Sequence, residues 1–353
     1  MQTDFIYEAL PTRVIFGEGK LAQLAPEIER LGAKRALILS TAQQEDWAQR
    51  ISDSLGTASA GVFAGAMMHT PVAVTETALE HVKATQADCV VALGGGSTIG
   101  LAKAIALRTG LPQIAVPTTY AGSEMTPILG QTENGVKTTQ RAPVIQPKTV
   151  IYDVDLTLTL PTGMSATSGL NAMAHAVEAL YAQDRNPIIS LVAEDGIRSM
   201  AAALPVIMQS PQDKAARLQA QYGAWLCGIC LGSAGMALHH KICHVLGGSF
   251  DLPHAETHAV MLPHTAAYNE PATETLARAA NALGTPTAGL GLWTLAQKIN
   301  APMSLKDIGM AESDIEKAVE IALKNPYWNP RPLEAEGLRG LLKRAWAGEA
   351  PTA

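Results

Sequence analysis

A change of pattern near residue 160 constrains the fold of this chain more than any other feature. Before it, short β-rich runs alternate with helical patterns, which is typical of a parallel sheet covered by helices. The expected strands cover residues 35 to 40, 60 to 63, 88 to 93, 113 to 116 and 149 to 153, and helical spacing marks residues 75 to 85 and 97 to 107. After LPTG at 160 to 163, Ala- and Leu-rich stretches run nearly to the end. We therefore predict an α/β domain with a Rossmann-like parallel sheet over residues 1–158 and an all-α domain over residues 159–353.

Clusters of Pro, Gly and Asn divide the second half of the chain. These breaks, at DRNP, QSPQD, LGTPTAG and NAPMS, indicate eight or more helices. Two domains suit a chain of 353 residues, because single cores stop growing near ~250 to 300 residues. We expect the functional site in the cleft between the two domains, where small molecules usually bind.

Composition excludes several classes of partner. Charged residues make up only 16% of the chain, below the usual ~25%, so part of the surface is expected to be buried in a homo-oligomer. The net charge is −6 and the 26 Lys and Arg residues are scattered, which argues against a nucleic-acid partner. The sequence shows no signal peptide and no run of ~18 apolar residues, so we expect a cytoplasmic protein without a membrane segment. Cys227 and Cys230 form a C-x-x-C in apolar helical surroundings, which favours core residues over a redox pair.

A glycine-rich turn follows the strand expected at 88 to 93. It places Gly94, Gly95, Gly96, Ser97 and Thr98 at the start of a helix. Backbone without side chains can approach a pyrophosphate closely, and the free N–H groups of a helix start can hold its charge. The spacing differs from G-x-G-x-x-G, but the strand-turn-helix context favours dinucleotide binding over a turn without a ligand.

Other hydroxyl side chains stand at the ends of neighbouring strands. Ser40 and Thr41 occupy the place where many dinucleotide proteins carry an acid for the ribose 2′-hydroxyl, so NADPH is expected to bind as well as NADH. In VPTTYAGSEMT, the side chains of Thr118, Thr119 and Ser123 could contact the same cofactor.

Histidines concentrate in the second half of the chain. His240 and His244 share a helix face, His254 follows after a short loop, and Asn171 and His175 form a second i, i+4 pair. Several imidazoles within apolar sequence need partners, which favours a functional site over isolated core histidines. His239 is expected to point elsewhere, about 100° round the helix from His240, and His258 and His264 could be structural.

These segments resemble the iron-containing alcohol dehydrogenase superfamily over essentially the whole chain. The motifs are GGGS at 94 to 97, PTT at 117 to 119, an LTLP segment and the two histidine segments. The resemblance implies a dehydroquinate-synthase-like architecture and a homodimer. It also implies a divalent metal held at the positions of Asn171, His175, His240 and His254, with His244 near the substrate and nicotinamide.

Asn171 departs from the aspartate of that pattern. A neutral amide is a weak ligand for a hard or borderline cation, although three histidines can still hold zinc. We therefore expect that Fe or Zn is not required; a bound metal would be held by His175, His240 and His254.

Within the superfamily, the segments PTTYAGSEMTPILG, SGLNAMAHAVEALYA and NPRPLE look most like the maleylacetate reductase group. That resemblance implies reduction of maleylacetate and chlorinated relatives to 3-oxoadipate with NADH or NADPH, in the degradation of aromatic compounds. Hydride would add to the alkene carbon β to the ketone, and His244 or His254 would deliver the proton. Lys241 and Arg331 are candidates to bind the carboxylates of this dicarboxylate substrate.

Three alternatives remain open. The first is a metal-dependent alcohol dehydrogenase on the same scaffold, against which Asn171 argues. The second is a lyase or synthase that recycles NAD, and the third is a nucleotide-binding regulatory protein that has lost its chemistry.

Overall fold

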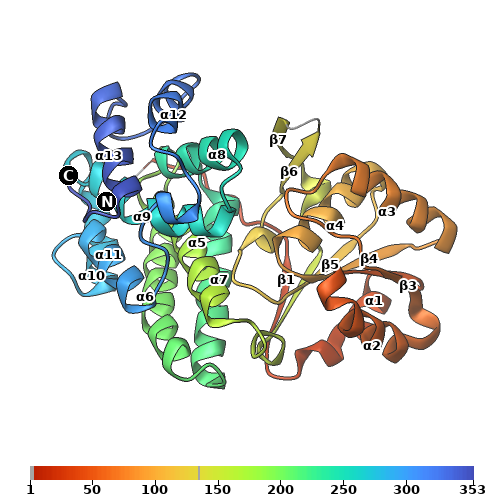
Figure 1. The fold of residues 1–353 in the computed structure, drawn as a ribbon. Coiled ribbons are helices and arrows are strands. Elements are labelled where there is room, and N and C mark those ends of the chain that lie inside the picture. The colour runs from red at the N-terminus through yellow and green to blue at the C-terminus, as the bar shows by residue number, and fades with distance from the viewer. Residues whose placement is uncertain (1–3, 134–135) are drawn as a thin grey trace. The chain divides into compact units, whose positions relative to one another are not determined.

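The computed structural model describes residues 4–133 and 136–353, and these form two units. Residues 10–160 form one unit, called here the sheet unit. Residues 161–353, together with the N-terminal segment up to Ala9, form the other, called here the helical unit (Figure 1). The predicted fold class, an α/β nucleotide-binding type of domain followed by an all-α domain, is confirmed.

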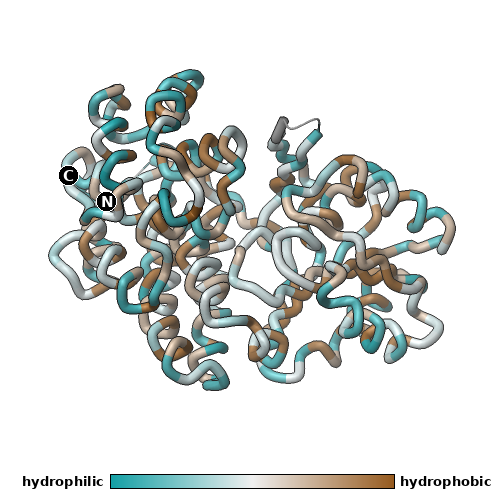
Figure 2. Tube along the Cα trace, viewed as in Figure 1, coloured by the Kyte–Doolittle hydropathy of each residue, from teal (hydrophilic) through white to brown (hydrophobic). Residues whose placement is uncertain are grey.

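The sheet unit is built on six parallel strands in the order β1-β8-β5-β4-β2-β3. Their bounds are β1 Arg13–Gly17, β2 Ala36–Leu39, β3 Ser59–Phe63, β4 Cys89–Gly94, β5 Gln113–Pro117 and β8 Thr149–Asp153. The four inner strands are fully or almost fully buried because their runs of Val, Ile, Leu and Ala have apolar side chains on both faces. They are among the brown, apolar segments of Figure 2.

Helices cover both faces of this sheet. These are α1 Leu24–Arg30, α2 Glu45–Leu55, α3 Val72–Thr85 and α4 Gly96–Thr109. Leu24 of α1 and Ala48 of α2 share a core cluster with Ile38, Val91 and Ile114, which point to one face. The helix α4 packs on β4 and β5 and is buried along most of its length.

Two parts of the sheet unit differ from the sequence expectation. The strand β1 was not predicted, because RVIFG is a short run near the chain start, yet it pairs with β8 at the edge of the sheet. Polar residues dominate the other missed element, an antiparallel hairpin of β6 Ile128–Glu133 and β7 Val136–Arg141. Short 3-10 turns complete the unit at Lys20–Gln23, Ala42–Gln44 (η2), Gly56–Ala58, Ser123–Met125 (η4), Pro143–Ile145 and Val154–Thr157.

The described secondary structure of the helical unit consists of helices alone. Its α-helices are α5 Thr162–Tyr181, α6 Pro187–Gln209, α7 Lys214–Ser233, α8 Leu238–Phe250, α9 His254–Asn269, α10 Ala277–Leu283, α11 Ala288–Lys298, α12 Asp314–Leu323 and α13 Ala335–Ala347. Three 3-10 turns lie at Glu270–Ala272, Glu274–Leu276 and Lys306–Ile308. The predicted breaks at DRNP, QSPQD and LGTPTAG fall between consecutive helices, as expected from their Pro and Gly content.

The helix α5 lies at the centre of the helical unit and is buried from Ser165 to Tyr181, because it packs on α6, α7 and α9. Cys227 and Cys230 are free thiols in the buried face of α7, so the prediction that they are core residues is confirmed. Among the described residues, no helix combines the length and apolar character needed to cross a membrane.

Candidate functional site

The glycine turn of the sheet unit has the close packing that its sequence predicts. Gly94 ends β4 with φ of 144°, and a Cβ there would meet Thr98 Oγ1 and lie 2.8 Å from Gln44 Oε1. A Cβ on Gly95 would lie 2.9 Å from Thr119 Oγ1. Gly96, by contrast, has no atom within 4 Å of a Cβ position and begins α4 without a side-chain cap. The turn therefore presents open space beside a helix start whose first N–H groups lack intrahelical acceptors.

Hydroxyl side chains follow the two strands that flank β4, at the same edge of the sheet. Ser40 follows β2 and Thr118 follows β5, and both strands pair with β4. The Thr118 N–H donates to the Gly94 carbonyl at 3.1 Å, and its hydroxyl accepts from the Gln44 amide. Ser40 Oγ is buried without a hydrogen-bond partner, while Thr41 begins the turn η2.

Ser123 has a further contact that its sequence did not predict. Its carbonyl and hydroxyl oxygens lie 2.5 and 3.2 Å from Nζ of Lys103, a fully buried residue of α4. The same ammonium donates to Thr126 Oγ1 and to the Ile128 carbonyl. Burial lowers the pKa of Lys103 to about 7, although the nearby Glu124 carboxyl acts in the opposite direction. Lys103 thus holds the loop that follows β5, and Ser123 is part of that structural contact.

In the helical unit, the four predicted histidines lie in one imidazole cluster. Ring centroids are 5.2 Å apart for His175 and His240, and 6.0 Å apart for His240 and His244. His254 is connected to the others through His258, whose ring lies 5.0 Å from that of His240 and 4.4 Å from that of His254. His175 and His240 are buried, whereas His244 and His254 are half-buried. The cluster therefore extends from the core of the unit to partly solvent-accessible rings.

Several buried polar atoms of this cluster have no hydrogen-bond partner: Asn171 Oδ1, His175 Nδ1 and His258 Nε2. Burial, reinforced by the neighbouring imidazoles, holds the pKa of His175 well below its usual value, and the pKa of His258 is lowered for the same reasons. Both rings are therefore neutral at ordinary pH and each keeps one nitrogen lone pair. Unpaired polar atoms inside a core are costly, and Asn171 Oδ1 and the ring lone pairs are suited to a ligand that supplies donors or positive charge.

Glu178, a fully buried carboxylate next to this cluster, was not predicted from the sequence. Its Oε2 lies 2.6 Å from His240 Nδ1 and 3.0 Å from the Ala237 N–H. Its Oε1 accepts the His239 N–H at 2.7 Å. Burial alone would raise the pKa of Glu178, but the charge and hydrogen bond of His240 outweigh it, so the pKa lies below its usual value. The spacing could have indicated it, because Glu178 lies one helical turn after His175.

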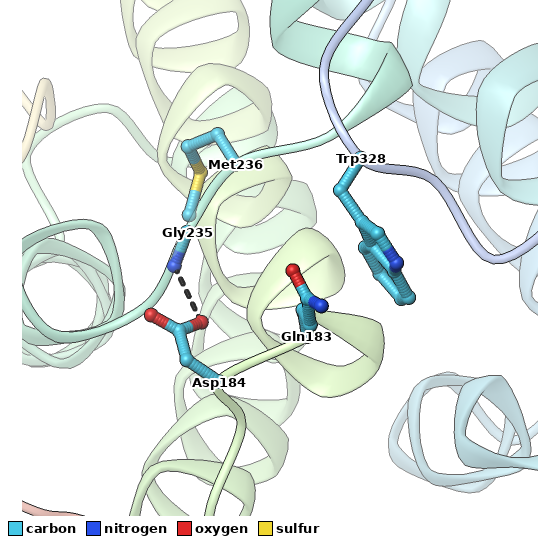
Figure 3. A pocket seen from close by; sticks show the side chains of 5 residues that line it. All are labelled: Gln183, Asp184, Gly235, Met236 and Trp328. Carbon is cyan, nitrogen blue, oxygen red and sulfur yellow. Dashed lines mark hydrogen bonds between the residues drawn. The ribbon is translucent and has the colours of Figure 1, made fainter.

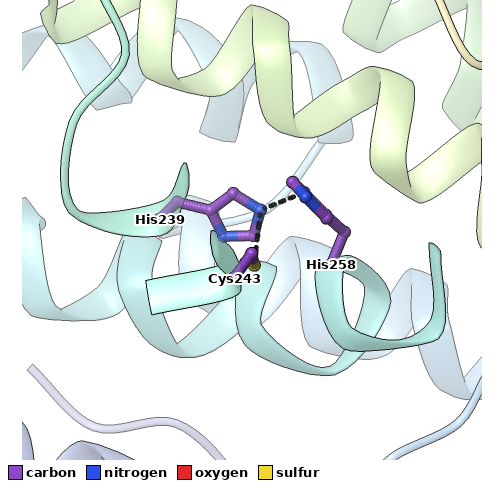
Figure 4. Close-up of side chains that lie close together, drawn as sticks. All are labelled: His239, Cys243 and His258. Atoms are coloured by element: carbon purple, nitrogen blue, oxygen red, sulfur yellow. Dashed lines mark hydrogen bonds between the residues drawn. The ribbon is translucent and has the colours of Figure 1, made fainter. Parts of the chain in front are cut away.

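His239 does not point away from the cluster, contrary to the expectation from its helix position. Its ring lies 5.5 Å from that of His240, and its Nε2 is 2.9 Å from His258 Nδ1 (Figure 4). The Sγ of Cys243 lies 3.7 Å from the same His239 nitrogen. Burial lowers the pKa of His239 to about 3 and, with Glu178, raises the pKa of the Cys243 thiol. His239, His258 and Cys243 therefore pack against His240 on the side of α9. The helices α8 and α9 are adjacent, so a residue 100° round α8 from His240 can still face α9.

The chain segment around Tyr327 borders the half-buried rings. The Tyr327 hydroxyl lies 3.2 Å from His244 Nδ1, and burial raises the pKa of that phenol. The predicted substrate residues have structural contacts with this same segment. Lys241 Nζ donates to the Lys324 carbonyl at 3.3 Å. Arg331 donates to the Tyr268 carbonyl and stacks 4.2 Å from its ring. Each of these contacts uses only some of the donors of the charged group, so a role for Lys241 and Arg331 in binding the substrate carboxylates stays a prediction.

A pocket of about 230 Å³ lies in the helical unit beyond the end of α5. Its lining residues are Gln183, Asp184, Gly235, Met236 and Trp328 (Figure 3). Asp184 Oδ1 accepts the Gly235 N–H at 2.8 Å, which fixes the loop between α7 and α8. This loop leads directly to Ala237, the residue bound by Glu178.

Comparison with known proteins agrees with this geometry. The model of the iron-containing alcohol dehydrogenases matches residues 11–154, and that of the C-terminal part of the family matches residues 165–346. The chain is 58% identical to the maleylacetate reductase of Rhizobium sp. (strain MTP-10005), over 98% of this chain and 99% of the relative. It is 52% identical to the maleylacetate reductase of Burkholderia cepacia, over 99% of each chain.

Solved structures extend the likeness to three dimensions. The crystal structure of maleylacetate reductase from Agrobacterium tumefaciens superposes with a TM-score of 0.96 at 58% identity, covering 99% of this chain and 100% of that one. The 1,3-propanediol oxidoreductase structure has a TM-score of 0.90 at 27% identity, covering 97% of this chain and 100% of that one. With two family models and relatives that match along nearly their whole length, the chain belongs to the iron-containing alcohol dehydrogenase family.

Proposed function

We propose that this protein uses NADH or NADPH to reduce the carbon-carbon double bond of maleylacetate, and of chlorinated maleylacetates, to the corresponding 3-oxoadipates. The observation that carries the proposal is the imidazole cluster, with the buried Asn171 one helical turn before His175, in a chain 58% identical to a maleylacetate reductase over nearly its full length. The uncharged Asn171 amide can donate a hydrogen bond to the oxygen of a conjugated ketone through its NH₂ group.

The chemistry follows from where charge develops. Bound NADH or NADPH would supply a hydride to the alkene carbon β to the ketone, and the electron pair of the double bond would move toward the ketone oxygen as an enolate. Hydrogen-bond donors aimed at that oxygen lower the barrier. A proton on the α carbon completes the reaction and leaves oxidised cofactor. His175 and His240 orient the enone together with Asn171.

His244 or His254 supplies the proton in this proposal. Both rings are half-buried, so they can be reprotonated from solvent after each turnover, whereas burial disfavours the protonated form of His175. The Tyr327 hydroxyl orients His244 through Nδ1. His244→Ala should lower kcat much more than cofactor affinity. A kcat within a few-fold of the native value would remove His244 from this role.

The cofactor is proposed to bind on the sheet unit. The open space at Gly96 and the unsatisfied N–H groups of the α4 start suit a pyrophosphate, with Ser97 and Thr98 in the first turn. Thr118 and Thr119 line the adjacent strand end, and Ser40 and Thr41 stand where no carboxylate repels a 2′-phosphate. Titration of cofactor fluorescence with NADH and NADPH measures this tolerance directly.

The family's metal requires a separate test, because the donor set is altered. His175, His240 and His254 would hold a divalent cation, with the unpartnered Asn171 Oδ1 as a neutral fourth ligand. A bound cation would act as a Lewis acid toward the ketone oxygen. Since an amide replaces the anionic ligand, we propose that the reduction does not require it.

NADH oxidation with maleylacetate, run before and after exhaustive chelation, tests both statements. Stoichiometric NADH consumption with formation of 3-oxoadipate supports the function. Activity lost on chelation and restored by Fe²⁺ or Zn²⁺ would overturn the metal-free reaction. Oxidation of ethanol or 1,2-propanediol only with added metal, without maleylacetate reduction, would replace the proposal by a metal-dependent alcohol dehydrogenase.

We further propose a cytoplasmic homodimer without nucleic-acid partners. The low charged fraction, 16%, and the scattered positive charge support this view. Light scattering coupled to size-exclusion chromatography gives the number of subunits.

A further inference from the structure

We propose that Glu178 is a positioning residue of the active site, which keeps the proton of His240 on Nδ1 and so leaves Nε2 as the nitrogen that acts on a ligand. The inference rests on the proposed function for its kinetic consequence, but its structural content does not depend on the substrate. It concerns one buried carboxylate, one imidazole and the start of α8.

The position of Glu178 makes it an acceptor at both oxygens. The helix α8 begins at Leu238 without a side-chain cap from its N-cap residue, Ala237. Glu178, from α5, takes the place of that cap, because its oxygens accept the N–H groups of Ala237 and His239 at 3.0 and 2.7 Å. Backbone N–H groups can only donate, and a negative charge at a helix start is stabilised by the helix dipole. Both contacts favour the ionised, acceptor-only form of the carboxyl group.

An ionised Glu178 determines the protonation pattern of His240. The oxygen Oε2 lies 2.6 Å from Nδ1, a short distance typical of a charge-assisted hydrogen bond. A carboxylate cannot donate, so the proton of this bond must sit on Nδ1. The ring is fully committed on that side, so the neutral ring meets a ligand through the lone pair on Nε2. A carboxylate that orients an imidazole in this way normally raises its effectiveness as a ligand or base.

Asp184 offers a natural comparison. It follows the same helix, α5, and its Oδ1 accepts the Gly235 N–H at 2.8 Å, two residues before Ala237. Asp184 and Glu178 therefore anchor the same loop by carboxylate-to-backbone bonds. Only Glu178 also binds an imidazole. Amide variants at the two positions separate loop anchoring from control of the His240 proton.

The test compares Glu178→Gln with Asp184→Asn. With its oxygen in the place of Oε1, glutamine still accepts the His239 N–H, while its NH₂ group in the place of Oε2 would donate to His240 Nδ1 and move the ring proton to Nε2. The Ala237 N–H loses its acceptor in this variant. We expect kcat for maleylacetate to fall by about 10- to 100-fold or more in Glu178→Gln, with KM and the cofactor Kd changed less than threefold. Asp184→Asn should remain within about twofold of the native enzyme. These ratios correspond to the effect of losing one orienting partner.

A spectroscopic measurement decides the tautomer independently of activity. In protein labelled with ¹⁵N-histidine, the His240 signals, assigned by their loss in His240→Asn, should report a protonated Nδ1. In Glu178→Gln the Nδ1 signal should change to the unprotonated type. If Glu178→Gln does not fold, the spectrum of the native protein still decides which nitrogen of His240 carries the proton. An unprotonated Nδ1 in that spectrum overturns the proposal.

Other outcomes also overturn it. These are a kcat in Glu178→Gln within threefold of native, a kcat loss without a change at Nδ1, or an equal loss in Asp184→Asn. A native enzyme that does not reduce maleylacetate would instead refute the proposed function, and the ¹⁵N spectra would still decide the role of Glu178.

Discussion

His239 Nε2 lies 2.9 Å from His258 Nδ1, and this contact is the middle of a hydrogen-bonded chain that begins at Thr265. The Thr265 hydroxyl donates to the Met261 carbonyl at 3.0 Å, so it accepts from His239 Nδ1, also at 3.0 Å. A neutral His239 then has a lone pair on Nε2 and accepts from His258 Nδ1. By elimination, His258 Nε2 has a bare lone pair within the imidazole cluster, where it has no protein partner.

The first prediction concerns Thr265, the residue at which these linked hydrogen bonds begin. Thr265→Val removes the acceptor of a buried His239 N–H, which should lower the free energy of unfolding by about 1–3 kcal/mol in urea titrations. Thr257→Val is the matched control on the same helix, because the buried Thr257 hydroxyl donates only to the Pro253 carbonyl at 2.7 Å among the contacts seen here. It should cost less than about 1 kcal/mol. Equal losses in the two variants would contradict the proposed direction of the chain.

The second prediction separates folding from cofactor binding at the glycine turn. Gly96→Ala has open space for its Cβ and should not reduce stability, but the methyl group would occupy the proposed pyrophosphate position and raise the Kd for NADH about tenfold or more. Gly163→Ala, also in the first turn of a helix with no atom within 4 Å, should change neither quantity. Thermal unfolding and fluorescence titration measure both effects. An unchanged Kd in Gly96→Ala would place the pyrophosphate elsewhere.

Gly94→Ala should behave differently, because its φ of 144° and the contact with Thr98 make any Cβ strained. We expect a loss of stability of at least about 1 kcal/mol, detectable as a lower denaturation midpoint. A variant as stable as the native protein would contradict the packing of this turn.

Much of the fold could be predicted because its signals are local. Buried parallel strands are continuous apolar runs, and the runs at 36 to 39, 89 to 94 and 113 to 117 contain little else. The edge strand β1 has an apolar run of only three residues and the hairpin β6–β7 is mostly polar, since an edge strand or a hairpin needs fewer apolar residues. These strands form because β1 pairs with the distant β8 and β6 pairs with β7, and a short stretch of sequence does not show such pairing.

The candidate site could be predicted only in part, for a similar reason. His175, His240, His244 and His254 were found because their i, i+4 spacing and concentration are visible in the sequence. Glu178 is the single acid of α5 and lies one turn after His175, but the groups that it binds, on Ala237, His239 and His240, are some 60 residues away in the sequence. Lys103 has the sequence of a surface lysine, yet its partners lie in the loop after β5 and at the start of β6. Such roles arise only from tertiary contacts.

The third prediction follows from those contacts of Lys103. Lys103→Met leaves the partly buried Ser123 and Ile128 carbonyls without their donor and should lower the free energy of unfolding by about 3 kcal/mol. It should also raise the KM for NADH, because the loop it holds includes the region around Thr118 and Thr119. Lys83→Met, at an exposed position of α3, is the control and should lie within about 0.5 kcal/mol of native. Similar unfolding curves for all three proteins would refute the structural role of Lys103.

The last prediction concerns acid stability and rests on His264, a buried ring of α9 packed edge-on against Trp293. Burial, with a smaller effect of Arg344, lowers the pKa of His264 to about 4, against an ordinary value of 6.5. Between these values the unfolded chain binds a proton that the native ring does not. His264 therefore leaves the free energy of unfolding unchanged above about pH 6.5. Below that pH it lowers the free energy of unfolding by about 1.4 kcal/mol per pH unit, until the pH reaches about 4.

Replacing the ring should remove that part of the slope. Urea unfolding of the native protein and of His264→Gln, measured between pH 4.5 and 8 in steps of half a unit, gives the difference in free energy at each pH. The difference should be constant above pH 7 and should shift in favour of the variant below about 6.5, because glutamine binds no proton in either state. Parallel curves over the whole range would mean that His264 is protonated equally in both states. The acid sensitivity of the helical unit would then have to come from His239, His258 and His175, whose pKa values are also lowered by burial.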